Sequence, residues 1–139
     1  MLKAERCYQL NSHQDGDFFL LMKKYYRLTR NEDFSKVINK KHTISNSYFV
    51  VYYSENELDH LRVGLSVGKK MGNAVVRNKI KRQVRMMIDN LCDFKINGDV
   101  IVITKTNYHN NSFEENKLYL SQLLKKVKIN TYSILICKE

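Results

Sequence analysis

The chain has 139 residues, of which 43% are hydrophobic, so it can bury one core and is not a wholly disordered protein. Its 24 Lys and Arg residues outnumber its 14 Asp and Glu residues, which gives a formal net charge of +10. A surplus of this size on a small domain favours an anionic partner, either nucleic acid or an acidic membrane, although charge alone leaves a merely basic protein open.

Cysteine and histidine usage argues against a zinc site or a disulfide framework. The three Cys and four His residues are widely spaced, and no Cys-x-x-Cys pair occurs. No run approaches the ~18–20 apolar residues of a membrane span, and the apolar run at residues 18–22 is too short for a signal peptide. We therefore expect a cytoplasmic protein with no membrane partner and no small-molecule cofactor.

Residues 1–21 differ from the rest of the chain, because they lack clear periodicity and carry little of the positive charge. We interpret them as an N-terminal extension of unknown role, and expect either that Met22 is the physiological start or that the extension is dispensable. Residues 22–128 form the expected main domain, and residues 129–139 a C-terminal strand or tail.

Thr29 and Glu32 have the spacing of a capping box, which predicts a short helix with Thr29 as its N-cap and its end near Lys40 or Lys41. Two strands are then expected. Residues 48–53 are β-branched and aromatic throughout, and residues 61–67 alternate. Leu61, Val63, Leu65 and Val67 should face a core, and Arg62, Gly64 and Ser66 the opposite side.

A long amphipathic helix should follow a turn at residues 68–72, with Asn73 as its N-cap and its end near Cys92. Its apolar face is formed by Val76, Ile80, Val84, Met87, Ile88 and Leu91.

The remaining elements are a turn at residues 97–98, a buried strand at 100–103 and a helix that opens with the capping box of Ser112 and Glu115. Leu120, Leu123, Leu124 and Val127 should point inward, and residues 132–137 form a last strand or a tail. This order predicts an α/β chain, a two-layer α+β sandwich with helices packed on one sheet.

The long helix also carries a basic stripe. Arg77, Lys81 and Arg85 are spaced by four, and no acid occurs from Arg62 to Met87. An ordinary solvated helix face usually mixes both signs, so this stripe predicts an anion-binding surface.

Aromatic residues are core residues by default, but a strand alternates faces. If one face lies open beside the basic helix, Tyr52 or Phe34 could stack on unpaired bases, which suits single-stranded nucleic acid. The chain has no HExxH, GxSxG, Walker or GxGxxG sequence, and its acids are dispersed. We therefore expect no catalytic or metal-ligating residue in the protein.

The frame Gly-Asn-Ala-Val-x-Arg-Asn-x-x-Lys-Arg that begins at Gly72 resembles the protein subunit of bacterial ribonuclease P, whose Arg-Asn-Arg signature stands here as Arg77-Asn78-Lys79. The resemblance extends upstream through residues 62–67 and 26–34, and covers about residues 22–127. It implies a mixed four-stranded sheet with a left-handed βαβ crossover, and the strand count reaches four if residues 43–45 pair separately from 48–53.

The resemblance also implies a function. An RNA subunit that binds Mg²⁺ would remove the 5′ leader of precursor tRNA, and the protein would bind the RNA subunit and the leader. By position, the RNA-binding residues would be Lys69, Lys70, Asn73, Arg77, Asn78, Lys79, Lys81, Arg82 and Arg85, and the leader-binding cleft would be lined by Phe34, Ile38, Tyr52 and Ser66.

Three positions depart from the family pattern. Ile38 replaces a common aromatic residue, Ser47 replaces a usual Arg, and Lys79 keeps the charge but not the planar fork of Arg. Two other functions suit a basic helix on a small sheet, namely a ribosome-associated or RNA-chaperone module and a DNA-binding regulator.

Overall fold

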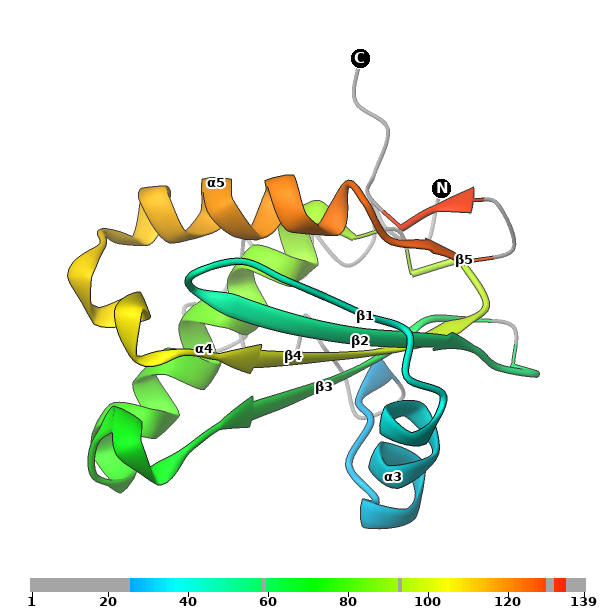
Figure 1. Cartoon of the computed structure of the whole chain (residues 1–139), viewed down its shortest axis with the longest axis horizontal. Helices are drawn as coiled ribbons and strands as arrows, with labels where there is room; N and C mark the ends of the chain where they lie inside the picture. The colour runs from blue at the N-terminus through cyan, green and yellow to red at the C-terminus, as the bar shows by residue number, and fades with distance from the viewer. Residues whose placement is uncertain (1–25, 59, 93, 130–131, 135–139) are drawn as a thin grey trace, which may run out of the picture.

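A mixed four-stranded sheet organises the chain (Figure 1). The structure, a computed structural model, describes residues 26–58, 60–92, 94–129 and 132–134, so the predicted extension 1–21 lies outside the described residues. The strand order is β1 (Thr43–Ser45), β2 (Phe49–Glu55), β4 (Gly98–Thr104) and β3 (Arg62–Val67). The pairs β1–β2 and β2–β4 are antiparallel, whereas β3 and β4 are parallel. Residues 43–45 thus form a strand of their own, paired with β2, and this brings the count to the four strands that the resemblance implies.

Helices cover both faces of this sheet (Figure 1). Between β3 and β4 runs α4 (Ala74–Leu91), and α5 (Phe113–Leu124) follows β4. Both pack on one face around the main core, whereas the shorter α3 (Asn31–Asn39) packs on the opposite face. A second, two-stranded sheet joins β5 (Lys128–Ile129) to β6 (Tyr132–Ser133). The predicted α/β class with a mixed four-stranded sheet is confirmed, and the left-handed sense of the β3–α4–β4 crossover stays an expectation from the resemblance.

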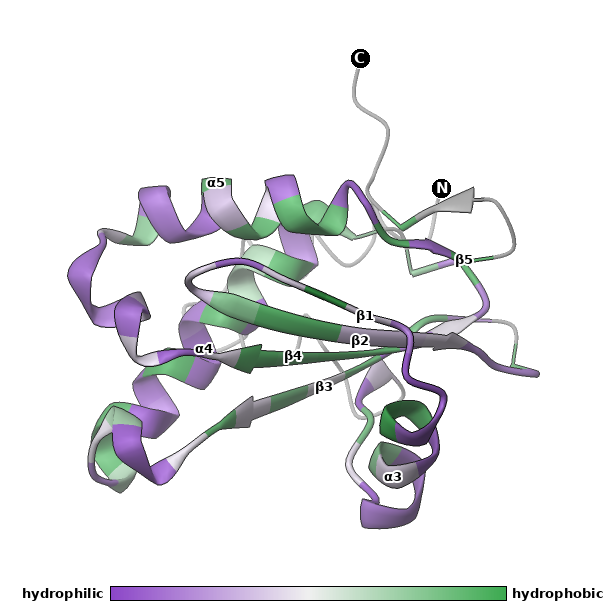
Figure 2. Ribbon diagram, viewed as in Figure 1, coloured by the Kyte–Doolittle hydropathy of each residue, from purple (hydrophilic) through white to green (hydrophobic). Residues whose placement is uncertain are grey.

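The alternation of side chains along each strand builds the two cores. Phe49 and Val51 of β2 and Val100 and Val102 of β4 are buried in the main core with α4 and α5. Ile101 points to the other face, where it forms a second cluster with α3. Figure 2 shows hydrophobic and hydrophilic bands alternating along α4 and α5, as expected for helices with one buried side.

The predicted local patterns are largely confirmed. On β3, Val63 and Val67 are buried in the main core, and Leu65 packs partly against it. On α4, Asn73 is the N-cap and Ile80, Val84, Met87 and Ile88 are buried. The capping box of α5 forms between Ser112 and Glu115, and its four predicted inward residues are buried.

The predicted start of α3 is wrong. The helix begins at Asn31, its N-cap is Arg30, and no side chain caps it. Thr29 is not the N-cap, because Arg30 after it is still extended, with φ −79° and ψ 138°, and itself takes the N-cap position. The segment before Arg30 pairs with β3. Arg27 forms an isolated parallel β-bridge with Val63, Leu28 N donates to Val63 O at 2.9 Å, and Leu28 is 2% exposed.

The end of β2 and the start of β4 also differ from the predicted boundaries. The strand predicted at residues 48–53 extends two residues further, because Ser54 and Glu55 still pair with Asp99 and Gly98. Gly98 is therefore the first residue of β4 rather than part of a turn.

Candidate nucleic-acid interface

The start of α4 is set by a sharp turn. Gly72 has a φ of 141°, which an L side chain rarely adopts, and a short 3-10 helix precedes it at Lys69–Met71. The Asn73 side chain then accepts a hydrogen bond from Val76 N at 3.0 Å and begins the helix. Lys69 and Lys70 are exposed on the 3-10 helix that precedes α4, and no acid lies in the first turn of α4. Both the turn and the helix dipole favour an anion here.

The predicted RNA-binding residues all reach the surface, on the 3-10 helix and along α4. Arg77, Lys81 and Arg85 are half-buried, and Arg77 Nε donates to Gly72 O at 3.2 Å. Among the described residues, no carboxylate forms a salt bridge with Arg77, Lys81 or Arg85. The positive charge of these three side chains is therefore available to an anionic partner. The other predicted RNA-binding residues are exposed: Lys69, Lys70, Asn73, Asn78, Lys79 and Arg82.

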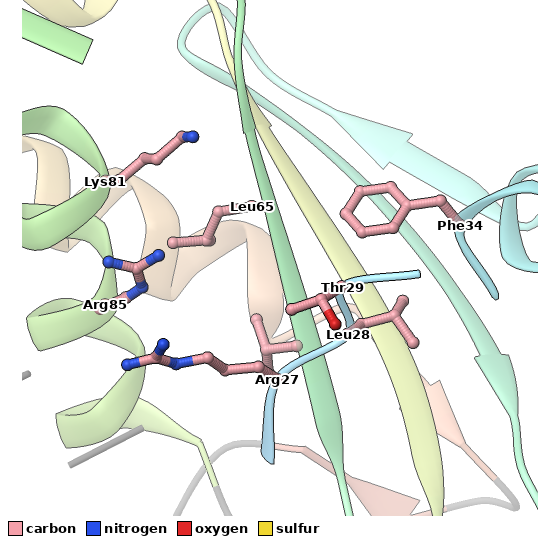
Figure 3. Close-up of a pocket in the computed structure, with 8 residues that line it drawn as sticks. Arg27, Leu28, Thr29, Phe34, Leu65, Lys81 and Arg85 are labelled. Atoms are coloured by element: carbon pink, nitrogen blue, oxygen red, sulfur yellow. The ribbon is translucent and has the colours of Figure 1, made fainter. Parts of the chain in front are cut away.

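A pocket of about 210 Å³ lies where α4 approaches β3 (Figure 3). Lys81 and Arg85 enter it from α4, and Arg27 enters from the segment before α3. Phe34 lies across β3 from these cations, as Figure 3 shows. The other lining residues are Leu28, Thr29, Val63 and Leu65. The pocket therefore combines cations with apolar and aromatic walls, which suits a phosphate carrying a nucleoside.

The cations in this pocket repel one another. Burial lowers the pKa of the Arg85 guanidinium, and the positive charge of Arg27 lowers it further. Arginine remains protonated in proteins, so the shift reports that its charge is poorly compensated. An anion bound between Arg27 and Arg85 would relieve both costs.

The four residues of the predicted leader-binding cleft lie on α3 and on the sheet face that α3 covers. Phe34 and Tyr52 pack together against the second cluster, which contains Val37 and Ile101. Ser66 lies on this face beside Ile103, which also packs on the cluster. Ile38 is 38% exposed at the surface of α3.

Sequence reasoning missed Arg27, Thr29 and Leu65 as pocket residues. Leu65 was assigned to the core by its alternation, and it indeed packs partly against the core. Arg27 could have been suspected only from its place in the segment 26–34, because its position depends on pairing with a strand more than thirty residues away.

The described residues do not supply a metal site, since no group of three or more His, Cys, Asp and Glu side chains among them could hold an ion. The cationic interface itself is also unsuited to a resident Mg²⁺, which prefers carboxylate and water oxygens. No described helix is long and apolar enough to cross a membrane.

Comparisons with known proteins place these features in one family. The ribonuclease P family model matches residues 22–128. The ribonuclease P protein component of Mesoplasma florum is 42% identical over 105 residues, which is 74% of this chain and 96% of the relative. That of Oceanobacillus iheyensis is 45% identical over 107 residues, covering 76% of this chain and 88% of the relative.

Solved structures agree with the sequence comparisons. The Staphylococcus aureus RNase P protein matches with a TM-score of 0.65 and 38% identity, over 72% of this chain and 93% of that chain. The RNase P protein from Thermotoga maritima matches with a TM-score of 0.66 and 29% identity, over 73% of this chain and 97% of that chain.

Proposed function

The chain belongs to the ribonuclease P protein family, and we propose that it binds the catalytic RNA subunit through α4 and the 5′ leader of precursor tRNA beside α3. As a ribonuclease P protein component, it is one subunit of an endoribonuclease holoenzyme. The bound leader would be removed by endonucleolytic cleavage, which gives the mature 5′ end of the tRNA.

The pocket between α4 and β3 carries this proposal. It is lined by Lys81 and Arg85 of the basic stripe on α4 and, on the other side of β3, by Phe34 of the leader-binding cleft, so one strand of RNA could contact both surfaces. Cations that flank an aromatic ring bind single-stranded nucleic acid through phosphates and stacked bases. The other predicted RNA-binding residues on α4 and on the 3-10 helix before it would bind the RNA subunit, chiefly at phosphates.

The protein contributes binding and orientation in this account. Mg²⁺, held mainly by the RNA subunit, would supply the activated water and stabilise the charge of the leaving group. The side chains at residues 77–85 keep positive charge close to the RNA backbone, which lowers repulsion between the RNA subunit and its RNA substrate. The leader, held on α3 and the sheet, would fix the scissile phosphate relative to the RNA subunit.

Reconstitution tests the function. The full chain alone should not cleave precursor tRNA. Added to a bacterial ribonuclease P RNA subunit at a Mg²⁺ concentration too low for the RNA alone, it should restore cleavage at the mature 5′ end. Absence of stimulation under those conditions, with the RNA subunit active at high Mg²⁺, would contradict the proposal.

A further inference from the structure

Arg62 lies at the centre of a polar network that joins four separate parts of the chain, namely α3, the segment after β2, β3 and β4. It is the first residue of β3, and it stands directly opposite Asp99 of β4 in the parallel register. Arg62 Nε donates to Asp99 Oδ1 at 2.9 Å, and Nη2 donates to Asp99 Oδ2 at 2.9 Å. Asn56 Nδ2 donates to the same Oδ1 at 2.8 Å. The two hydrogen bonds from Arg62 to Asp99 fix the plane of the guanidinium.

The fixed guanidinium directs its remaining nitrogen at α3. Arg62 Nη1 donates to Asp33 Oδ2 at 3.3 Å, and Asp33 lies in the first turn of α3. The three side chains are largely shielded, with exposures of 22% for Arg62, 16% for Asp33 and 9% for Asp99. Solvent therefore screens this ion pair less than it would screen an exposed pair.

The ion pair adjoins the residue that lines the pocket. Asp33 directly precedes Phe34, and the Phe34 ring lies over Gly64, two residues along β3 from Arg62. Among the described residues, the cluster that holds α3 on the sheet has three fully buried members, Leu28, Val37 and Ile101, with Phe34, Tyr52 and Ile103 partly buried against it. This apolar contact is small, so the position of the nine-residue helix on the sheet also depends on its polar contacts.

We propose that Arg62 and Asp33 are positioning residues for the leader, because their ion pair holds α3, and with it Phe34, at the height that admits a nucleotide. Neither residue needs to touch RNA in this role. The inference rests on the proposed function, since it concerns the same leader site.

Two variants with the same change in net charge test the inference. Asp33→Asn removes the acceptor charge but keeps the side-chain shape, and Arg62 remains paired with Asp99. Glu32→Gln is the matched control, since Glu32 is the exposed neighbouring acid in the same helical turn. Both variants raise the attraction for RNA equally through net charge, so a difference between them reports the Asp33 contact. Asp33→Glu keeps the charge and serves as the rescue variant.

Dissociation constants of the full chain, assembled with the RNA subunit, should be measured for precursor tRNA and for mature tRNA. Asp33→Asn should weaken precursor binding about tenfold relative to Glu32→Gln, the scale of one hydrogen bond to a charged group, and leave mature tRNA unchanged. Asp33→Glu should recover most of the affinity. In NMR spectra, the NOE between the Phe34 ring and the Gly64 α-protons should weaken in Asp33→Asn alone.

Equal precursor affinity of Asp33→Asn and Glu32→Gln would overturn the inference, and so would an equal decrease in affinity for precursor and mature tRNA. A wild-type assembly that does not distinguish precursor from mature tRNA would instead contradict the proposed leader binding itself.

Discussion

The ring of Phe34 occupies the space that a side chain at position 64 would need. A β-carbon built on Gly64 would lie 2.6 Å from Phe34 Cζ and 3.1 Å from Leu28 O. Glycine at this strand position therefore lets α3 approach the sheet, and it sets where the aromatic wall of the pocket lies.

Gly64→Ala should displace the Phe34 ring, because the ring is the movable partner whereas Leu28 O belongs to the backbone. We expect the free energy of unfolding to fall by about 1–3 kcal/mol from overpacking, together with weaker binding of precursor tRNA but not of mature tRNA. Urea denaturation and affinity measurements check the two effects. Gly68→Ala is the matched control, since nothing lies within 4 Å of a β-carbon there and its φ is −72°. Equal behaviour of the two variants would contradict the role of Gly64.

The basic face of α4 should dominate the salt dependence of RNA binding. Replacing Arg77 and Lys81 together with Ala should reduce the log–log slope of affinity against salt by about 0.7–0.9 for each phosphate that is no longer neutralised. Lys125 and Lys126, at the C-terminal end of α5, provide a control pair with the same change in charge. A slope that changes equally in both double variants would indicate general electrostatic attraction rather than specific phosphate binding at α4.

Asp89 should make stability depend on pH. It lies on α4 with 7% exposure, and burial raises its pKa to about 7 from an ordinary value of 3.8. Between these two values the folded state holds a proton that the unfolded state releases, so stability decreases as pH rises.

Asp89→Asn, which mimics the protonated form, should therefore match the wild type near pH 4 and exceed it at pH 8. The difference is at most a few kcal/mol, at about 1.4 kcal/mol per pKa unit. Free energies of unfolding measured for both proteins at several pH values check this expectation. A difference that does not grow with pH would show that the Asp89 carboxyl does not titrate in this range.

Lys41 ends α3 in a left-handed conformation. Its φ is 62°, and its amide donates to Ile38 O at 3.0 Å. Lys41→Gly should stabilise the protein by roughly 0.5–1 kcal/mol, because glycine adopts this conformation without a steric cost. Lys40→Gly, at a φ of −72°, removes the same charge but should destabilise the protein. Urea denaturation of both variants separates the conformational effect from the charge.

Local sequence patterns were sufficient for α4, β3 and α5. Asn73 caps α4 and Ser112 caps α5. Both caps could be predicted from the sequence, because each hydrogen bond joins residues only three positions apart. The basic stripe of α4 could be read in the same way, since it depends only on helical spacing. These elements account for the RNA-binding residues that the sequence predicted.

The rest depends on contacts between distant segments. Thr29 matches a capping box, but Leu28 pairs with Val63 and the chain stays extended through Arg30, so the helix begins at Asn31. Arg27 reaches the pocket because its segment pairs with β3, and Arg62 reaches Asp33 because α3 packs on the sheet. Neither contact can be predicted from the helix and strand propensities of neighbouring residues.

Site-specific photocrosslinking most directly tests whether α4 contacts the RNA subunit while the surface beside α3 contacts the leader. p-Benzoylphenylalanine should replace Ile38 in one variant, Lys79 in a second and Lys125 as a control, each assembled with the RNA subunit and precursor tRNA. We expect crosslinks from position 38 to nucleotides of the 5′ leader, from position 79 to the RNA subunit, and from position 125 to neither. Crosslinks from position 38 to the body of the tRNA but not to its leader, or from position 79 to no RNA, would contradict the account.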